Sequence, residues 1–174
     1  MSAQSTVVFI AYGTNMSLDH TPGRQALPHI VAELKSCGVI VNKFSRLWHS
    51  RAWPDPNDPP YRNAVIEGLT EHSPEDVMAV LHRLEADAGR IRDGRANAPR
   101  NAPRTLDLDL IAYGDRIIDE NGLIVPHPRA YDRAFVMGPL AEIAPGWVHP
   151  MLKKTAVELY ETATVGRDAY PLDA

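Results

Sequence analysis

Apolar residues recur along this chain with two periods, one typical of strands and one typical of helices. Residues 6–12 form a run of β-branched and aromatic side chains that stops at Gly13, which predicts a buried strand. From Thr21-Pro22 to Gly38 the apolar residues fall three and four positions apart. This spacing predicts an amphipathic helix that starts with a hydroxyl and a proline.

The middle of the chain predicts two further strands and a second helix. Residues 39–48 and residues 64–69 have strand character, and the segment from Arg51 to Pro60 between them holds four prolines. So many prolines predict a long, rigid loop. A helix is expected to begin at Ser73-Pro74, where a hydroxyl, a proline and two acids precede the apolar stripe, and to end at Gly89.

Residues 105–112 complete the pattern as a strand, and apolar and polar side chains alternate strictly from Thr105 to Leu110. The element order β-α-β-β-α-β predicts an α+β, ferredoxin-like fold, in which helices pack on an antiparallel sheet. Beyond this strand we expect a short strand pair around residues 116–125 and helices at about 135–142 and 153–162. These C-terminal additions would give α/β/α layers, and residues 1–174 would form a single domain.

Composition narrows the function classes. Hydrophobic residues make up 44% of the chain and charged residues 23%, which is typical of a globular protein. We expect a cytoplasmic protein without a membrane partner, because no apolar run approaches a span of about 20 residues and no signal-peptide pattern stands near the start. Cys37 is the single cysteine, which agrees with a reducing compartment. The net charge of −4 argues against a general nucleic-acid binder.

The local charge around residue 100 differs from that of the whole chain. Between residues 90 and 104 there are five arginines and one acid, and Asp107 and Asp109 follow directly. On a strand these two aspartates share one face, about 6.6 Å apart. Like charges on one face repel unless a cation or basic groups lie between them. Mg²⁺ ligands beside guanidinium groups are typical of a polyphosphate site, and the structural alternative is a solvated strand face.

A smaller set of residues suggests a site for a flat heterocycle. Trp53 and Tyr61 flank the proline-rich loop, and the Asn63 amide could pair with the edge of such a ring. The alternative for Tyr61 is a place in the core. For His127, which stands between two prolines, the alternative is a structural turn.

Five segments carry recognisable motifs. They are Gly89-Arg90-Ile91-Arg92, Ala102-Pro103-Arg104-Thr105-Leu106-Asp107-Leu108-Asp109-Leu110, Val125-Pro126-His127-Pro128-Arg129, Arg133 with Phe135, and the stretch from Pro139 to Pro145. Together they resemble the 6-hydroxymethyl-7,8-dihydropterin pyrophosphokinases of folate biosynthesis. The similarity covers about residues 6–150, so residues 151–174 would be a C-terminal extension of the same domain.

The resemblance implies the reaction and its site. It implies transfer of the pyrophosphoryl group of ATP to 6-hydroxymethyl-7,8-dihydropterin with release of AMP, with two Mg²⁺ ions held by Asp107 and Asp109. We expect the protein to be a monomer. Arg90 and Arg104 would act in catalysis beside these aspartates. The residues implied to bind ATP are Arg90, Arg92, Arg104, Leu110, His127 and Arg133. Those implied to form the pterin pocket are Ser50, Trp53, Tyr61, Asn63 and Phe135, with Tyr61 and Phe135 on opposite faces of the ring.

Two other function classes fit the same element order. Another two-metal nucleotidyl transferase on a ferredoxin-like palm would use the same aspartates and release pyrophosphate instead of AMP. An RNA-binding module would stack bases on the sheet, but Asp107 and Asp109 would repel phosphate there, and no strand carries an aromatic-basic cluster.

Overall fold

The computed structural model describes residues 4–15, 26–52, 55–88 and 106–173. Within these residues one antiparallel sheet has the strand order β5-β1-β4-β3-β8, and β2 also pairs with β4. Its strands are β1 (Thr6–Thr14), β2 (Val39–Phe44), β3 (Trp48–Ser50), β4 (Tyr61–Thr70), β5 (Asp107–Tyr113) and β8 (Tyr170–Pro171). The order of β5, β1, β4 and β2 confirms the predicted ferredoxin-like arrangement.

One face of this sheet is covered by α1 (Leu27–Ser36) and α2 (Pro74–Asp87). Their buried apolar stripes pack against alternate residues of the strands, such as Val8 and Ile10 of β1, to form one core cluster. The amphipathic spacing of both helices therefore predicted correctly which side faces inward. Ser73 caps α2 by accepting a hydrogen bond from the Asp76 N–H at 3.1 Å, as its sequence signature indicated.

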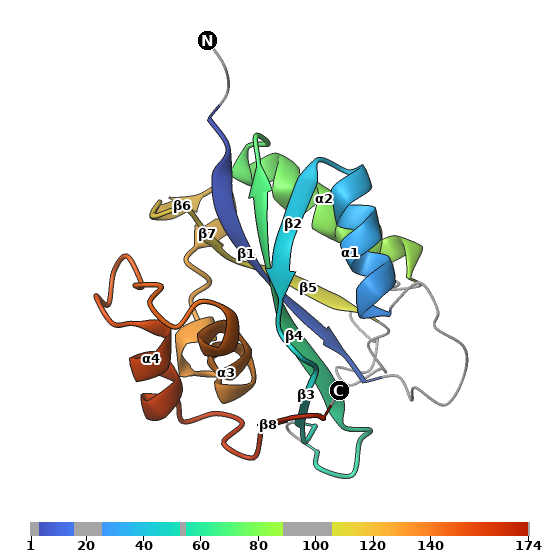
Figure 1. The fold of residues 1–174 in the computed structure, drawn as a ribbon, viewed down its shortest axis with the longest axis vertical. Helices are drawn as coiled ribbons and strands as arrows, with labels where there is room; N and C mark the ends of the chain where they lie inside the picture. Colours follow the sequence, from blue (N-terminus) through green and yellow to red (C-terminus); the bar gives the residue numbers. More distant parts are fainter. Residues whose placement is uncertain (1–3, 16–25, 53–54, 89–105, 174) are drawn as a thin grey trace.

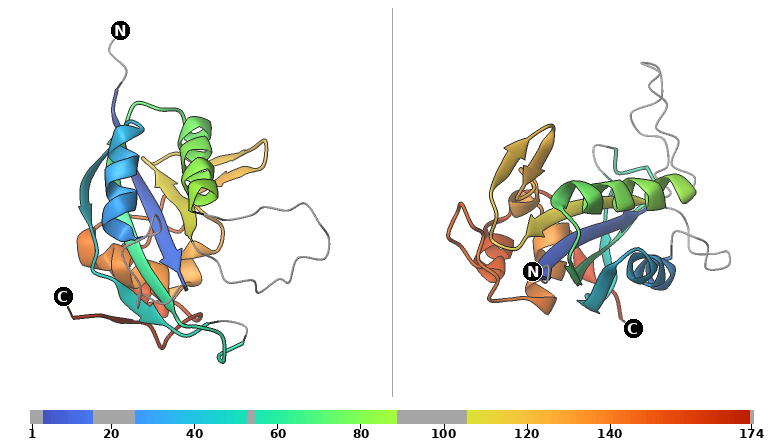
Figure 2. Two further views of the ribbon diagram at one scale, coloured as in Figure 1. Left: turned by 90° about the vertical axis from the view of Figure 1, so that its right-hand side faces the viewer. Right: turned by 90° about the horizontal axis from the view of Figure 1, so that it is seen from above.

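The opposite face of the sheet is covered by α3 (Ala134–Ile143) and α4 (Ala156–Thr162). Phe9 and Ala11 of β1 point to this side and join a second core cluster with these helices. The two helix pairs on either side of the sheet give the predicted α/β/α layers (Figures 1 and 2). Burial on both faces explains why β1 is a continuous apolar run instead of an alternating one.

Shorter elements connect these layers. β6 (Ile118–Glu120) and β7 (Leu123–Val125) form the predicted hairpin, and the 3₁₀ turn η1 (Ala130–Asp132) leads into α3. α4 begins three residues later than predicted, because Thr155 and Glu158 form a reciprocal cap at its start.

Several predicted boundaries were wrong. The first helix begins at Leu27 after Ala26, so its start carries no capping hydroxyl, and Thr21-Pro22 lies outside the described residues. The strand predicted at residues 39–48 is divided into β2 and β3, both paired with β4. β4 begins at Tyr61 instead of Ala64, because pairing with β3 and β1 extends it beyond its apolar run.

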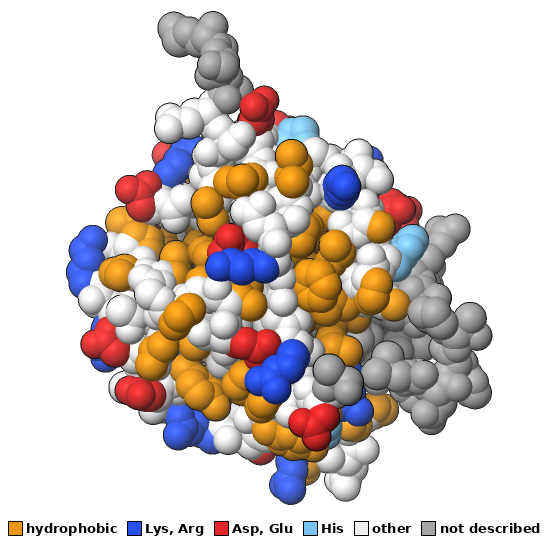
Figure 3. All heavy atoms as spheres, viewed as in Figure 1, with side chains coloured by type: hydrophobic (Ala, Val, Ile, Leu, Met, Phe, Trp, Pro, Cys, Tyr) orange, Lys and Arg blue, Asp and Glu red, His pale blue; other side chains and the backbone are white. Residues whose placement is uncertain are grey.

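β2 lies at the edge of the sheet and exposes apolar side chains. Ile40 is 59% exposed and Phe44 is 45% exposed, and Figure 3 shows hydrophobic patches interrupted by charged side chains on the face where β2 lies. A register shift between Val41 and Lys43 and a 3.3 Å ion pair between Lys43 and Glu67 interrupt this edge. Such features hinder edge-to-edge pairing with another sheet. In the described part of the chain no helix has the length and apolar character needed to span a membrane.

Candidate active site

The two aspartates of β5 lie on one face of the sheet. Leu106, Leu108 and Leu110 alternate with them and are buried beneath α1 and α2, whereas Asp107 and Asp109 are partly exposed. The strict alternation of Leu and Asp thus places both carboxylates on one face, as predicted, and the structure shows that this is the side of α3 and α4.

A row of three residues crosses the sheet beside Asp107. In the pairing register Asp107 lies opposite Gly13, and Gly13 lies opposite Asn63. A Cβ placed on Gly13 would lie 3.7 Å from Asn63 Oδ1 and 3.9 Å from Asp107 Cβ. Because Gly13 has no side chain, it leaves space between the amide of Asn63 and the side chain of Asp107. This pairing also explains why β1 runs through Gly13 to Thr14 instead of ending before it.

Asn63 is held in place by hydrogen bonds. Its side-chain N–H donates to Ser50 Oγ at 2.8 Å and to the Trp48 carbonyl at 3.3 Å, and both Asn63 and Ser50 are buried. A buried amide needs such partners, and here they orient it. Tyr61, two residues earlier on β4, is partly exposed and shares the sheet face of Asn63. Three of the predicted pterin residues are therefore neighbours at one end of β3 and β4.

His127 lies in the segment after β7 and is anchored to β5. Its backbone N–H donates to the Ile111 carbonyl of β5 at 2.9 Å, and its Nδ1 accepts the Arg129 N–H at 3.2 Å. Burial and the nearby positive charge of Arg133 lower the pKa of His127, while the carboxylate of Asp107 acts in the opposite direction. Arg133 and Asp107 thus both act electrostatically on His127, and the lowered pKa favours the neutral imidazole.

Phe135 lies in the first turn of α3, where it is half-buried against the second core cluster. The guanidinium carbon of Arg133 lies 5.9 Å from the centre of its ring. Because α3 packs against β4 and β3, the Phe135 ring lies on the same side of the sheet as Asn63 and Asp107.

Comparison with known proteins identifies the family. The family model described as 7,8-dihydro-6-hydroxymethylpterin-pyrophosphokinase (HPPK) matches residues 9–145. The chain belongs to this family. A Synechocystis 2-amino-4-hydroxy-6-hydroxymethyldihydropteridine pyrophosphokinase is 40% identical over 144 residues, which are 83% of this chain and 68% of the relative. A Haemophilus influenzae protein of the same name is 35% identical over 82% of this chain and 84% of its own.

A solved structure shows the same fold. The crystal structure of Plasmodium falciparum HPPK-DHPS with pteroate superposes with a TM-score of 0.70 over 92% of this chain, at 11% sequence identity. This chain spans 45% of that longer protein.

Not every HPPK residue predicted from the sequence can be placed. Arg90, Arg92, Arg104 and Trp53 lie outside the described residues. The Leu110 side chain is 3% exposed and lies in the core beneath α1 and α2, so its contact with ATP stays a prediction.

Sequence reasoning missed Glu85, which lies on α2 and is 1% exposed. Its carboxylate accepts the Leu108 backbone N–H at 2.9 Å, between the two aspartates of β5. A signal was present, because position 85 is four residues after Leu81 and therefore falls on the buried stripe of the helix. A glutamate at such a position is rarely buried without a partner.

The donor set of β5 fits magnesium. Two carboxylates on one strand face are hard oxygen ligands, and no cluster of three or more His, Cys, Asp or Glu side chains forms a metal site within the described ranges. Mg²⁺ is commonly held by one or two carboxylates and completes its shell with water and substrate phosphates. Asp107 and Asp109 would therefore hold the metal together with a nucleotide.

Proposed function

We propose that this HPPK-family chain transfers the pyrophosphoryl group of ATP to 6-hydroxymethyl-7,8-dihydropterin, with AMP as the second product. The observation that carries the proposal is the row Asn63, Gly13 and Asp107, which sets an amide suited to a heterocycle beside a carboxylate suited to a metal-bound polyphosphate. In the reaction the hydroxymethyl oxygen bonds to the β-phosphorus of ATP. The bond from that phosphorus to the α-phosphate oxygen breaks, and the hydroxyl proton is lost to water.

The pterin is proposed to bind between Tyr61 and Phe135. Asn63 and Ser50 would present hydrogen-bonding groups to the ring edge, and the fixed orientation of Asn63 supports this role. Trp53 is proposed to complete the pocket. A flat ring between two aromatic side chains gains stacking energy and is held in one plane, which aligns its hydroxymethyl group with the acceptor position.

The ATP side is proposed to lie at the β5 edge. Asp107 and Asp109 would hold two Mg²⁺ ions, which neutralise phosphate charge and orient the triphosphate when bound. Arg90, Arg92, Arg104 and Arg133 would contact phosphate oxygens, and Leu110 is proposed to contact ATP. Neutral His127, whose Nδ1 accepts the Arg129 N–H, can donate its Nε2–H to an acceptor of the nucleotide without adding to the positive charge. Catalysis then rests on positioning and charge neutralisation, without a protein nucleophile.

We also propose that the chain is a single-domain monomer. The interrupted edge of β2, with its register shift and the Lys43–Glu67 ion pair, supports this state. Analytical ultracentrifugation of the full chain at micromolar concentration measures the oligomeric state directly.

Product analysis tests the reaction. The purified chain is incubated with ATP, Mg²⁺ and 6-hydroxymethyl-7,8-dihydropterin, and the nucleotides are separated by chromatography. We expect AMP to form in proportion to the pterin diphosphate, and both products to form about a hundredfold more slowly, or slower still, with Asp109→Asn. Release of pyrophosphate would instead identify a nucleotidyl transferase. Absence of any pterin-dependent nucleotide product from the folded wild-type chain would overturn the proposal.

A further inference from the structure

The segment after α4 lies beyond the family match, which ends at residue 145, yet it contacts both sides of the proposed pterin pocket. Figure 1 shows it running from α4 past α3 to β3, where it ends as β8. We call residues 163–172 the C-terminal strap. No motif in the sequence predicted a role for it.

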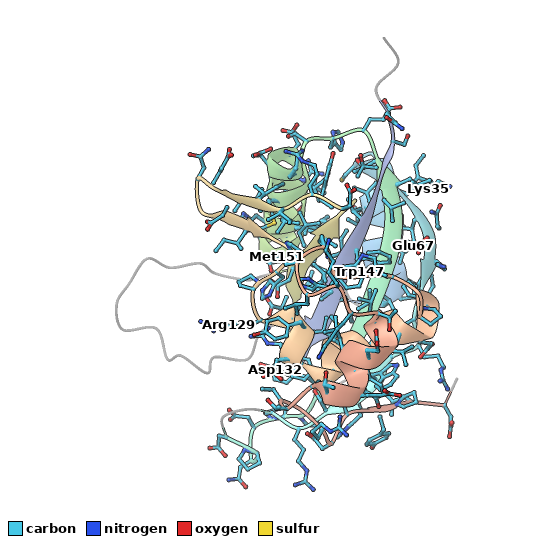
Figure 4. The ribbon with its side chains drawn as sticks, turned by 90° about the vertical axis from the view of Figure 1, so that its left-hand side faces the viewer. Lys35, Glu67, Arg129, Asp132, Trp147 and Met151 are labelled. Carbon is cyan, nitrogen blue, oxygen red and sulfur yellow. The ribbon has the colours of Figure 1, made fainter. Side chains whose placement is uncertain are left out.

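The strap first completes the start of α3. The Ala134 N–H, the first of this helix, donates to the Val165 carbonyl at 2.8 Å, and the Val165 N–H donates to the Asp132 carbonyl at 3.0 Å. Asp132, labelled in Figure 4, also accepts hydrogen bonds from the Thr164 N–H and hydroxyl, both at 2.8 Å. Because the N-cap residue of α3 makes no side-chain cap, the strap satisfies a backbone donor that would otherwise be unpaired there.

Gly166 then packs directly on Phe135. A Cβ on Gly166 would overlap the Phe135 ring, and Gly166 also has a left-handed backbone with φ +70°. The ring can therefore occupy its place only because position 166 has no side chain.

The far end of the strap is tied to the other side of the pocket. Asp168 Oδ2 accepts the Arg51 N–H at 2.7 Å, directly after Ser50, the hydroxyl partner of Asn63. β8 pairs with β3, and the Leu172 N–H donates to the Leu47 carbonyl at 2.8 Å. One continuous segment thus connects the helix turn that carries Phe135 to the strand that carries Ser50.

We propose that the C-terminal strap sets the width of the pterin pocket, with Gly166 as the positioning residue for the Phe135 ring and Asp168 as the positioning residue for the Ser50–Arg51 backbone. The inference rests on the proposed function, since it assigns the strap a role in binding the same pterin. Its consequence is specific: a defect in the strap weakens pterin binding and leaves nucleotide binding unchanged.

The first test compares two glycine variants of the full chain. Gly166→Ala forces Phe135 to move, whereas Gly122→Ala introduces the same left-handed strain at φ +81° in the β6–β7 turn with no atom within 4 Å. We expect Gly166→Ala to raise the KM for the pterin about tenfold with the KM for ATP unchanged, and Gly122→Ala to change neither. In a Phe135→Ala background, Gly166→Ala should have no further effect on the KM for the pterin.

The second test uses Asp168, so that the result does not depend on the folding of one variant. Asp168→Ala removes the acceptor of the Arg51 N–H, and Asp168→Asn keeps a carbonyl oxygen there. We expect the alanine variant to raise the pterin KM several-fold and the asparagine variant to restore it. If wild type turns over and both Gly166→Ala and Asp168→Ala keep the wild-type pterin KM, the strap has no positioning role. A wild-type chain without pterin-dependent AMP release contradicts the proposed function instead.

Discussion

The carboxylate of Glu85 on α2 accepts a hydrogen bond from the backbone N–H of Leu108 on β5, at 2.9 Å. Among the described residues β5 is an edge strand, so the N–H groups on its outer side have no partner in another described strand. Glu85 supplies that partner between Asp107 and Asp109. The relationship ties the orientation of the strand face proposed to bind metal to the end of α2.

Replacing Glu85 should therefore affect both stability and activity. Glu85→Ala leaves the buried Leu108 N–H unsatisfied, and we expect a loss of about 1–3 kcal/mol in the free energy of unfolding, together with a lower kcat. Glu85→Gln keeps an acceptor oxygen, so we expect a smaller loss in the free energy of unfolding and a smaller decrease in kcat. Urea denaturation and steady-state kinetics measure the two effects. Equal stability of wild type and Glu85→Ala would show that this hydrogen bond is unimportant.

Replacing either aspartate of β5 should lower the activity without lowering the stability of the fold. We expect Asp107→Asn and Asp109→Asn to lower kcat about a hundredfold or more, because a metal-binding carboxylate is lost. Neither variant changes an apolar side chain of the core, and each relieves repulsion between like charges, so the melting temperature should be equal or higher. Near-normal kcat at saturating Mg²⁺ in either variant would contradict the metal assignment.

The two aromatic residues of the proposed pterin pocket, Tyr61 and Phe135, should each contribute to pterin binding. We expect Phe135→Ala and Tyr61→Ala each to weaken pterin affinity by about 1–3 kcal/mol, with ATP affinity retained. Isothermal titration calorimetry with the reduced pterin in the presence of a non-hydrolysable ATP analogue and Mg²⁺ measures both affinities. Tyr160→Leu is a suitable control, because the Tyr160 ring contacts Trp48 in the core and lies outside the proposed pocket. An unchanged pterin affinity in Phe135→Ala would exclude the stacked arrangement.

Glu142 should make the stability of the chain depend on pH. Partial burial opposes ionisation of Glu142, but hydrogen bonds from the Arg46 N–H and the Trp48 indole outweigh it and hold its pKa below 4.5. A carboxyl group with a lower pKa in the folded state stabilises the fold fully above pH 4.5 and loses this contribution as the pH falls through the folded value. Glu142→Gln should therefore cost about 1 kcal/mol at pH 7 and progressively less under acid conditions.

Thermal melts from pH 7 to pH 3 measure this difference. Arg46 is also part of the ion pair, so Arg46→Ala, which removes its guanidinium but keeps its N–H, separates the charge contribution from the backbone hydrogen bond. A gap between wild type and Glu142→Gln that stays constant across this range would assign the effect to packing.

Local sequence patterns were sufficient for most elements and for part of the site. The apolar stripes of α1 and α2 predicted the faces that pack on the sheet, and the alternation around Asp107 and Asp109 predicted that both share one strand face. These properties depend on residues only two to four positions apart, so helix and strand periodicity alone determines them. The order of elements then limited the topology to a ferredoxin-like sheet.

Tertiary structure decided what those patterns could not. The row of Asn63, Gly13 and Asp107 depends on the pairing register of three strands, which only contacts between distant segments can set. The same reason applies to Glu85, whose partner Leu108 lies on another element, and to Gly166, whose role depends on the Phe135 ring packed against it. The sequence by itself determined which side chains share a face; packing between distant segments decided which of those faces meet.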